Sequence, residues 1–154
     1  MRVLTIGYEG VKIDEFIDVL LVQGVHTLVD VRDFPLSRKP GFSKNPLSQA
    51  LADVNILYVH EKVLGTPKPI RDALKETGDW ATYEKSYLSF LAPREVHLSR
   101  VLDFDSVCLM CFEADHLECH RSLVARRMYE LHLVDEVKHL HPAAKKVNPS
   151  LVLA

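Results

Sequence analysis

The chain has 154 residues, of which 47% are hydrophobic and 26% are charged, and its formal net charge is −2. This length allows one domain with a substantial core, and the composition excludes a largely disordered chain and a fibre. The net charge gives no global positive field that would draw the protein onto nucleic acid.

Short β-rich runs alternate with amphipathic segments along the chain. Apolar side chains recur at helical spacing from Ile13 onward, and Gly24 closes this first helix. The stretch 32–46 holds three prolines and one glycine, which indicates a long loop. The sequence predicts strands at 2–6, 26–31, 56–60, 106–110 and, at an edge, 134–140, with further helices at 46–54, within 70–103 and at 119–131.

Strands that alternate with helices predict a parallel α/β sheet with right-handed crossovers. We expect a Rossmann-like three-layer sandwich, with a mostly parallel sheet of about five strands and helices on both faces. A single domain covers 1–154, with a core at about 2–140 and a C-terminal tail at 141–154. Ligands bind such sheets outside the carboxyl ends of the strands. Four polar segments, 7–9, 32–38, 60–65 and 111–121, should therefore converge on one edge and form one site.

The cysteines and the N-terminus indicate the compartment. The three cysteines all lie within 108–119, whereas a secreted disulfide framework would spread an even number along the chain. No apolar run approaches the roughly 20 residues of a membrane span, and the first residues lack the features of a signal peptide. We expect a cytoplasmic protein without a membrane partner.

Segment 111–121, CFEADHLECHR, holds the densest group of reactive side chains. Cys119 begins a helix, where the helix dipole and Arg121 both favour the thiolate. The free N–H groups of the first helical turn, with Arg121, would also cradle an anion. We expect Cys111 or Cys119 to be a nucleophile or redox thiol, with Glu113 and His120 as acid or base.

Two other interpretations of this segment compete. The cysteines are packing residues in the first, which fits Cys108 best because it lies inside a strand. The second is a structural zinc site, which would use Cys111, His116, Cys119 and His120. The segment lacks a C-x2-C pair with a distant partner pair, and the neighbours Cys119 and His120 do not easily share one ion at a helix start. We therefore expect no metal and no cofactor.

The other three segments add candidates for binding. Arg32 and Arg38 suit a phosphate or carboxylate, although Asp30 and Arg32 could instead form a structural ion pair that leaves Arg38 solvated. Tyr8 and Glu9 follow the first strand in TIGYEG, which is not a dinucleotide fingerprint. Tyr8 could stack on a ring and Glu9 could act as a base or hold a ribose; the alternative is a simple turn with a solvated Glu9.

His60 ends the third strand and could contact the same pocket, although a lone histidine is more often structural. The basic loop SRKPGFSKNP, at 37–46, is the one stretch that mixes positive charge with an aromatic ring, because it holds Lys39, Phe42 and Lys44. Such a mixture is typical of binding to a single nucleic-acid strand.

Four motifs together resemble one known family. TIGYEG at 5–10, LVDVRDFPLSRKPGF at 28–42, YVHEKVLG at 58–65 and CFEADHLECHR at 111–121 look like the family catalogued as domain of unknown function 488. The resemblance runs from Arg2 to about Leu140. It implies a small Rossmann-like α/β protein of prokaryotic type and supplies no reaction. The positions it carries over are Gly7, Asp30, Arg32, Pro35, Ser37, Arg38, Gly41, Phe42, Leu64, Gly65, Cys111, Glu113, Cys119, His120 and Arg121.

The leading hypothesis is a small enzyme that acts on an anionic substrate, nucleotide-like or nucleic acid. The catalytic candidates are Cys111, Glu113, Cys119 and His120. The substrate-binding candidates are Gly7, Tyr8, Glu9, Asp30, Arg32, Ser37, Arg38, Phe42, His60 and Arg121.

Two alternatives stay open. The first is a non-catalytic module that binds a nucleotide or a nucleic-acid strand. The second is a thiol redox sensor that joins Cys111 to Cys119, which requires Cα atoms within about 7 Å of each other. The sequence leaves a homo-oligomer open as well.

Overall fold

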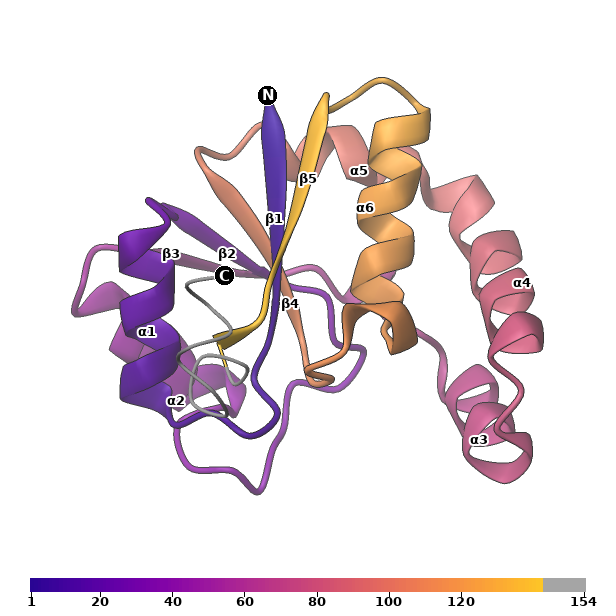
Figure 1. Ribbon diagram of the computed structural model, residues 1–154, viewed down its shortest axis with the longest axis horizontal. Coiled ribbons are helices and arrows are strands. Elements are labelled where there is room, and N and C mark those ends of the chain that lie inside the picture. Colours follow the sequence, from indigo (N-terminus) through magenta and orange to yellow (C-terminus); the bar gives the residue numbers. More distant parts are fainter. Residues whose placement is uncertain (143–154) are drawn as a thin grey trace, which may run out of the picture.

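The computed structural model describes residues 1–142, so most of the predicted C-terminal tail, 143–154, lies outside the described residues. Its centre is a five-stranded sheet in which every strand is parallel to its neighbours (Figure 1). The strand order is β3-β2-β4-β1-β5. The strands are β1 (Arg2–Gly7), β2 (Thr27–Asp30), β3 (Leu57–His60), β4 (Val107–Cys111) and β5 (Glu136–Leu140).

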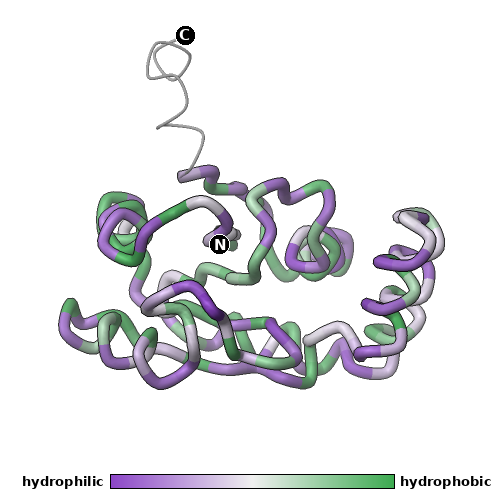
Figure 2. Tube along the Cα trace, turned by 90° about the horizontal axis from the view of Figure 1, so that it is seen from below, coloured by the Kyte–Doolittle hydropathy of each residue, from purple (hydrophilic) through white to green (hydrophobic). Residues whose placement is uncertain are grey.

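Helices cover both faces of this sheet, which confirms the predicted Rossmann-like sandwich. The helices are α1 (Ile13–Val22), α2 (Lys44–Ala52), α3 (Lys68–Thr77), α4 (Trp80–Leu91), α5 (Val96–Val101) and α6 (His120–Glu130). Short 3-10 turns lie at Lys62–Leu64, Ala92–Arg94 and His116–Glu118. In Figures 1 and 2, α3 and α4 form the end of the molecule that is farthest from α1.

The alternation of side chains along the strands divides the core into two halves. Strand β4 is buried along its whole length, and Cys108 packs with α1 and α2, whereas Cys111 packs with α4, α5 and α6. Residues three apart on a strand point to opposite faces. Cys111 therefore lies on the same side of the sheet as α6, whose N-cap residue is Cys119.

Gly78 and Pro93 interrupt the predicted helical region 70–103 and divide it into separate helices. Gly78 adopts the left-handed conformation (φ 68°) that ends α3, and Asp79 then caps α4 by accepting a hydrogen bond from the Thr82 amide. Pro93 lies in the 3-10 turn that ends α4. Among residues 1–142, no helix is both long and apolar enough to cross a membrane.

Candidate functional site

The segments that follow the strands meet at the carboxyl edge of the sheet. Gly7 pairs with Cys111 across β1 and β4, and Asp30 lies between Met110 and His60 in the register of β4, β2 and β3. A pocket of about 640 Å³ opens beside this edge. The predicted site residues in its wall are Tyr8, Arg32, Ser37, Arg38, Cys111, Glu113 and His120.

Helices α3 and α4 complete the pocket wall with residues that sequence reasoning missed. Arg71 and Lys75 come from α3, and Tyr83 comes from α4. Arg71 donates a hydrogen bond to Asp33, which also lines the pocket. The signal in the sequence was the spacing of Arg71 and Lys75, because residues four apart share one face of a helix.

The guanidinium group of Arg32 is hydrogen-bonded to other groups of the protein. Its side chain donates hydrogen bonds to both carboxylate oxygens of Asp30, to the hydroxyl of Tyr8 and to the carbonyl of Phe42. Burial alone would lower the pKa of Arg32, but the hydrogen bonds and charge of Asp30 outweigh it and raise the pKa. The structure thus contains the structural Asp30–Arg32 ion pair, and Arg38 is exposed at the pocket wall.

Two candidates that follow β1, Tyr8 and Glu9, contact other residues of the protein. Tyr8 stacks on Phe42 with ring centroids 4.5 Å apart, and Phe42 is fully buried outside the pocket wall. The carboxylate of Glu9 accepts a hydrogen bond from the Ala114 amide, and the Glu9 amide donates to the Phe112 carbonyl. Glu9 therefore fixes the loop between β4 and α6.

Gly7 and Arg121 also contact the loop between β4 and α6 and fix its position. A Cβ atom on Gly7 would overlap the carbonyl oxygen of Glu113, so this close approach requires glycine. Arg121 is fully buried and donates to the carbonyls of Glu113 (2.5 Å) and Ala114 (3.4 Å) and to the Thr5 hydroxyl (3.2 Å). Burial lowers its pKa to about 10. Arg121 is one of the predicted substrate-binding residues, but it is absent from the pocket wall.

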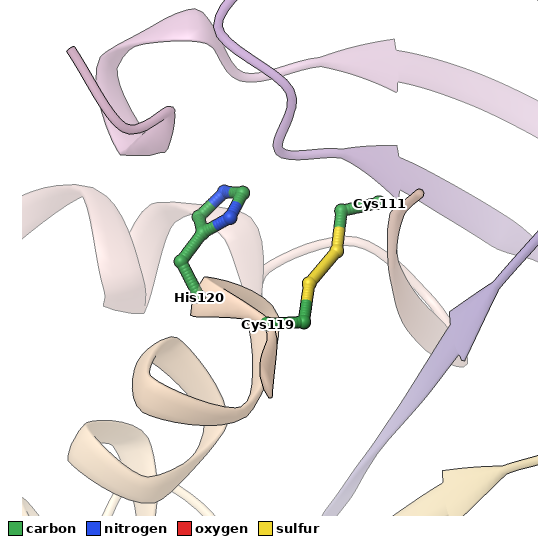
Figure 3. A group of neighbouring side chains, drawn as sticks. All are labelled: Cys111, Cys119 and His120. Carbon is green, nitrogen blue, oxygen red and sulfur yellow. A yellow bond between two sulfur atoms is a disulfide. The ribbon is translucent and has the colours of Figure 1, made fainter. Parts of the chain in front are cut away.

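Cys111 and Cys119 are joined by a disulfide bond between the end of β4 and the start of α6 (Figure 3). Their Cα atoms are 7.4 Å apart, slightly beyond the separation that the sequence hypothesis required for such a bond. Both residues are buried, but Cys111 reaches the pocket wall and Cys119 does not.

Two ionisable groups lie beside the sulfur of Cys111. Arg121 Nη1 and Glu113 Oε2 are each 3.5 Å from Cys111 Sγ. Burial raises the pKa of Glu113, so this carboxyl group is a better proton carrier near neutral pH than an exposed one.

His120 is buried next to the cysteine pair. Its Nε2 lies 2.7 Å from the carbonyl oxygen of Val31, so Nε2 carries the hydrogen and Nδ1 keeps a free lone pair. Burial lowers the pKa of His120 to about 4, which keeps the ring neutral at pH 7.

His60 is outside the pocket wall and donates to the Arg32 carbonyl. Among residues 1–142, three ligand atoms, from Cys111, Cys119 and His120, lie within 4.8 Å of one another.

The fold and the site together define a small parallel α/β protein with a partly basic pocket at the carboxyl edge of its sheet and a cysteine pair in and beneath the pocket wall. The family described as "Domain of unknown function DUF488" matches residues 12–128, and the chain belongs to this family. This confirms the predicted family, although the match begins after TIGYEG at 5–10. The comparisons with curated proteins and with solved structures gave no match.

Proposed function

We propose that this protein is a thiol-dependent enzyme that holds an anionic, nucleotide-like substrate in the 640 Å³ pocket and reacts with it through Cys111. The observation that carries the proposal is that Cys111 lies in the pocket wall, with a guanidinium group and a carboxyl group each 3.5 Å from its Sγ.

Of the three cysteines, Cys111 is the one that lines the pocket. Cys108 is fully buried, and burial raises the pKa of its thiol well above the ordinary value, so it stays protonated and inert. Cys119 is absent from the pocket wall. Cys111 is the remaining thiol that a molecule in the pocket can approach.

Arg121 supports a thiolate at Cys111. No carboxylate among residues 1–142 forms an ion pair with Arg121, whose hydrogen bonds go to three uncharged oxygens and to Cys111 Sγ. A buried cation without a paired anion favours a negative charge nearby. Once the disulfide is reduced, Cys111 can supply that charge, and Glu113 can take up or release the proton.

The pocket itself favours an anion with an apolar part. Arg38, Arg71 and Lys75 bring positive charge to its wall, which also holds Glu113, Glu118 and Asp33, the last of them paired with Arg71. Phe34, Leu36 and Phe112 are exposed in the same wall, with 61%, 60% and 45% of their surface accessible. Exposed rings beside cations suit a phosphate that is attached to a flat, partly apolar group.

The experiment is pH-dependent alkylation of the reduced protein, read for each cysteine by mass spectrometry. Cys119→Ser is the background, because it prevents the disulfide. A free thiol reacts with a midpoint at about pH 8.5. We expect the midpoint for Cys111 to be at least about one pH unit lower. Arg121→Gln should remove this advantage, and a nucleotide should protect Cys111 unless Arg38 and Lys75 are both changed to Ala. An ordinary midpoint for Cys111 that Arg121→Gln leaves unchanged would falsify the proposal.

The bonded sulfurs favour a second candidate function, which is thiol–disulfide exchange. In that reaction the Cys111 thiolate attacks a disulfide substrate and displaces one thiolate. Cys119 then attacks Cys111 Sγ, displaces the second thiolate and leaves the internal disulfide, which a dithiol reductant reopens. Cys119→Ser distinguishes the two functions, because it abolishes this exchange cycle and spares a reaction that needs Cys111 alone.

A further inference from the structure

We propose that the reduced protein binds one zinc ion through Cys111, Cys119 and His120, with a fourth coordination position that faces the pocket. The starting observation is that one potential ligand atom from each of these three buried residues lies within 4.8 Å of the other two. Two thiolates and an imidazole form a set that suits Zn²⁺. This inference does not rest on the proposed enzyme function, because metal binding needs no substrate.

The hydrogen bond of His120 prepares its ring for a metal. Nε2 donates to the Val31 carbonyl at 2.7 Å, which fixes the ring and leaves the lone pair on Nδ1. Metal-binding histidines usually donate their other ring N–H to a carbonyl or carboxylate in this way. Figure 3 shows the His120 ring extending from the start of α6 alongside the two sulfurs.

The charges around the sulfurs also balance with a divalent ion. Arg121 Nη1 and Glu113 Oε2 each lie 3.5 Å from Cys111 Sγ. Two thiolates supply two negative charges, which equal the charge of one Zn²⁺. The N–H of Arg121 can donate to the metal-bound sulfur of Cys111, which orients that ligand.

The backbone spacing is compatible with both states of the cysteine pair. With Zn–S bonds of about 2.3 Å and tetrahedral angles, the two sulfurs of one zinc site are about 3.8 Å apart. The Cα separation of 7.4 Å leaves room for this separation of the sulfurs. A dithiol reductant supplies two electrons and two protons to open the disulfide and is itself oxidised to a disulfide. Zn²⁺ then displaces the two thiol protons.

The position of the ligands makes this site open on one side. Cys111 and His120 both line the pocket, so the coordination position that the three side chains leave free points toward it. Zinc with three protein ligands and one open position is the arrangement of catalytic sites, whereas structural sites have four protein ligands.

Adjacent positions in the chain do not prevent Cys119 and His120 from sharing an ion, although the sequence pattern argued against it. Cys119 is the N-cap residue of α6 and His120 is its first residue, and their ligand atoms approach each other. His116 is not part of this group. It stacks on His139 with ring centroids 3.9 Å apart, and its Nδ1 lies 2.8 Å from His141.

The test is a titration of the whole chain, reduced with a phosphine that is then removed under anaerobic conditions. Co²⁺ is the spectroscopic probe and Zn²⁺ its competitor. We expect one Co²⁺ per chain, with a thiolate-to-cobalt charge-transfer band and the visible bands of tetrahedral cobalt, and displacement by Zn²⁺. Cys111→Ser, Cys119→Ser and His120→Ala should each weaken binding by about 100-fold or more.

Three controls separate this site from metal binding elsewhere on the chain. Cys108→Ser and His116→Ala should leave the affinity unchanged within about twofold, and the oxidised wild-type protein, which is folded, should not bind Co²⁺ with thiolate bands. Absence of a stoichiometric thiolate–cobalt complex in reduced wild-type protein would overturn the inference. So would binding that His116→Ala removes and Cys119→Ser preserves. Alkylation of Cys111 in metal-free protein tests the proposed enzyme separately.

Discussion

At the residue scale, Arg121 has the largest structural role in the site. It is a fully buried cation that gives hydrogen bonds to two carbonyl groups of the β4–α6 loop and to Thr5 on β1. A lysine retains the positive charge but lacks the planar fork of five N–H donors. At least one of these buried oxygens would then lose its partner.

We therefore predict that Arg121→Lys lowers the free energy of unfolding by about 2–3 kcal/mol. Urea unfolding of the oxidised protein measures this value. The matched control is Arg126→Lys on the same helix, where an exposed pair with Glu84 contributes less than about 1 kcal/mol. Equal losses in the two variants would show that the loop does not depend on Arg121.

The location of the site residues was easier to predict from the sequence than the direction of each side chain. Cys111, Glu113, His120, Tyr8 and Arg38 were placed at the carboxyl edge because parallel strands bring their ends together, and the structure places all five in one pocket wall. The inward position of Arg121 was not predicted, because a charged residue after a cysteine gives no sign of how deeply it is buried.

At the element scale, the end of β1 limits how closely the β4–α6 loop can approach. We predict that Gly7→Ala destabilises the protein by about 3 kcal/mol, because its Cβ would overlap the Glu113 carbonyl and the backbone would have to shift. Thermal or urea unfolding measures the loss. Gly24→Ala is the control, because Gly24 has a positive φ of 70° and nothing within 4 Å of its Cβ position. It should cost only about 1 kcal/mol. A Gly7 variant as stable as the Gly24 variant would contradict this packing.

His139 on strand β5 contacts Thr5 on strand β1. Its Nδ1 lies 2.7 Å from the Thr5 hydroxyl, and that hydroxyl accepts a hydrogen bond from Arg121. A neutral His139 accepts a hydrogen bond from the Thr5 hydroxyl at Nδ1, and a ring that is protonated at Nδ1 cannot accept it. Burial, followed by the charge of His116, lowers the pKa of His139 to about 4 from an ordinary value of 6.5.

As pH falls below 6.5, the unfolded chain takes up a proton that the folded His139 resists, so stability decreases down to about pH 4. Because the ring is only half buried, we expect a loss of about 1 kcal/mol between pH 7 and pH 4.5. His139→Asn keeps an acceptor near the Nδ1 position and does not titrate, so its unfolding free energy should change less over this range. The same pH dependence in both proteins would assign the effect to other groups.

Strand existence was easier to predict than strand order or the placement of the helices. Apolar runs bounded by glycine and proline identified all five strands within a few residues. The place of α3 and α4 beside the pocket depends on contacts between distant residues. Tyr83 shares a hydrogen bond with Thr66 at 2.6 Å, and Tyr87 donates to the Leu64 carbonyl at 2.5 Å. Helical periodicity alone cannot reveal such partners, so Arg71 and Lys75 were missed.

At the scale of the whole molecule, stability is distributed unevenly around the pocket. Helix α6 buries six of its eleven residues, whereas no residue of α3 is buried, and only Ile70 and Leu74 pack partly against the core. Local opening costs least where few apolar contacts are lost. The wall that carries Arg71 and Lys75 is therefore the part of the pocket that can open without disturbing the sheet.

We predict that backbone amides of α3 exchange with deuterium at least about 100-fold faster than those in the centre of α6, which corresponds to a difference of about 3 kcal/mol in opening free energy. Hydrogen exchange read by mass spectrometry measures both helices in one sample. An anion that binds Arg71 and Lys75 should slow exchange in α3 and leave α6 unchanged, and Lys75→Ala should weaken this protection. Uniform exchange in the two helices, or protection that appears first in α1 on the opposite face, would contradict a pocket closed by α3.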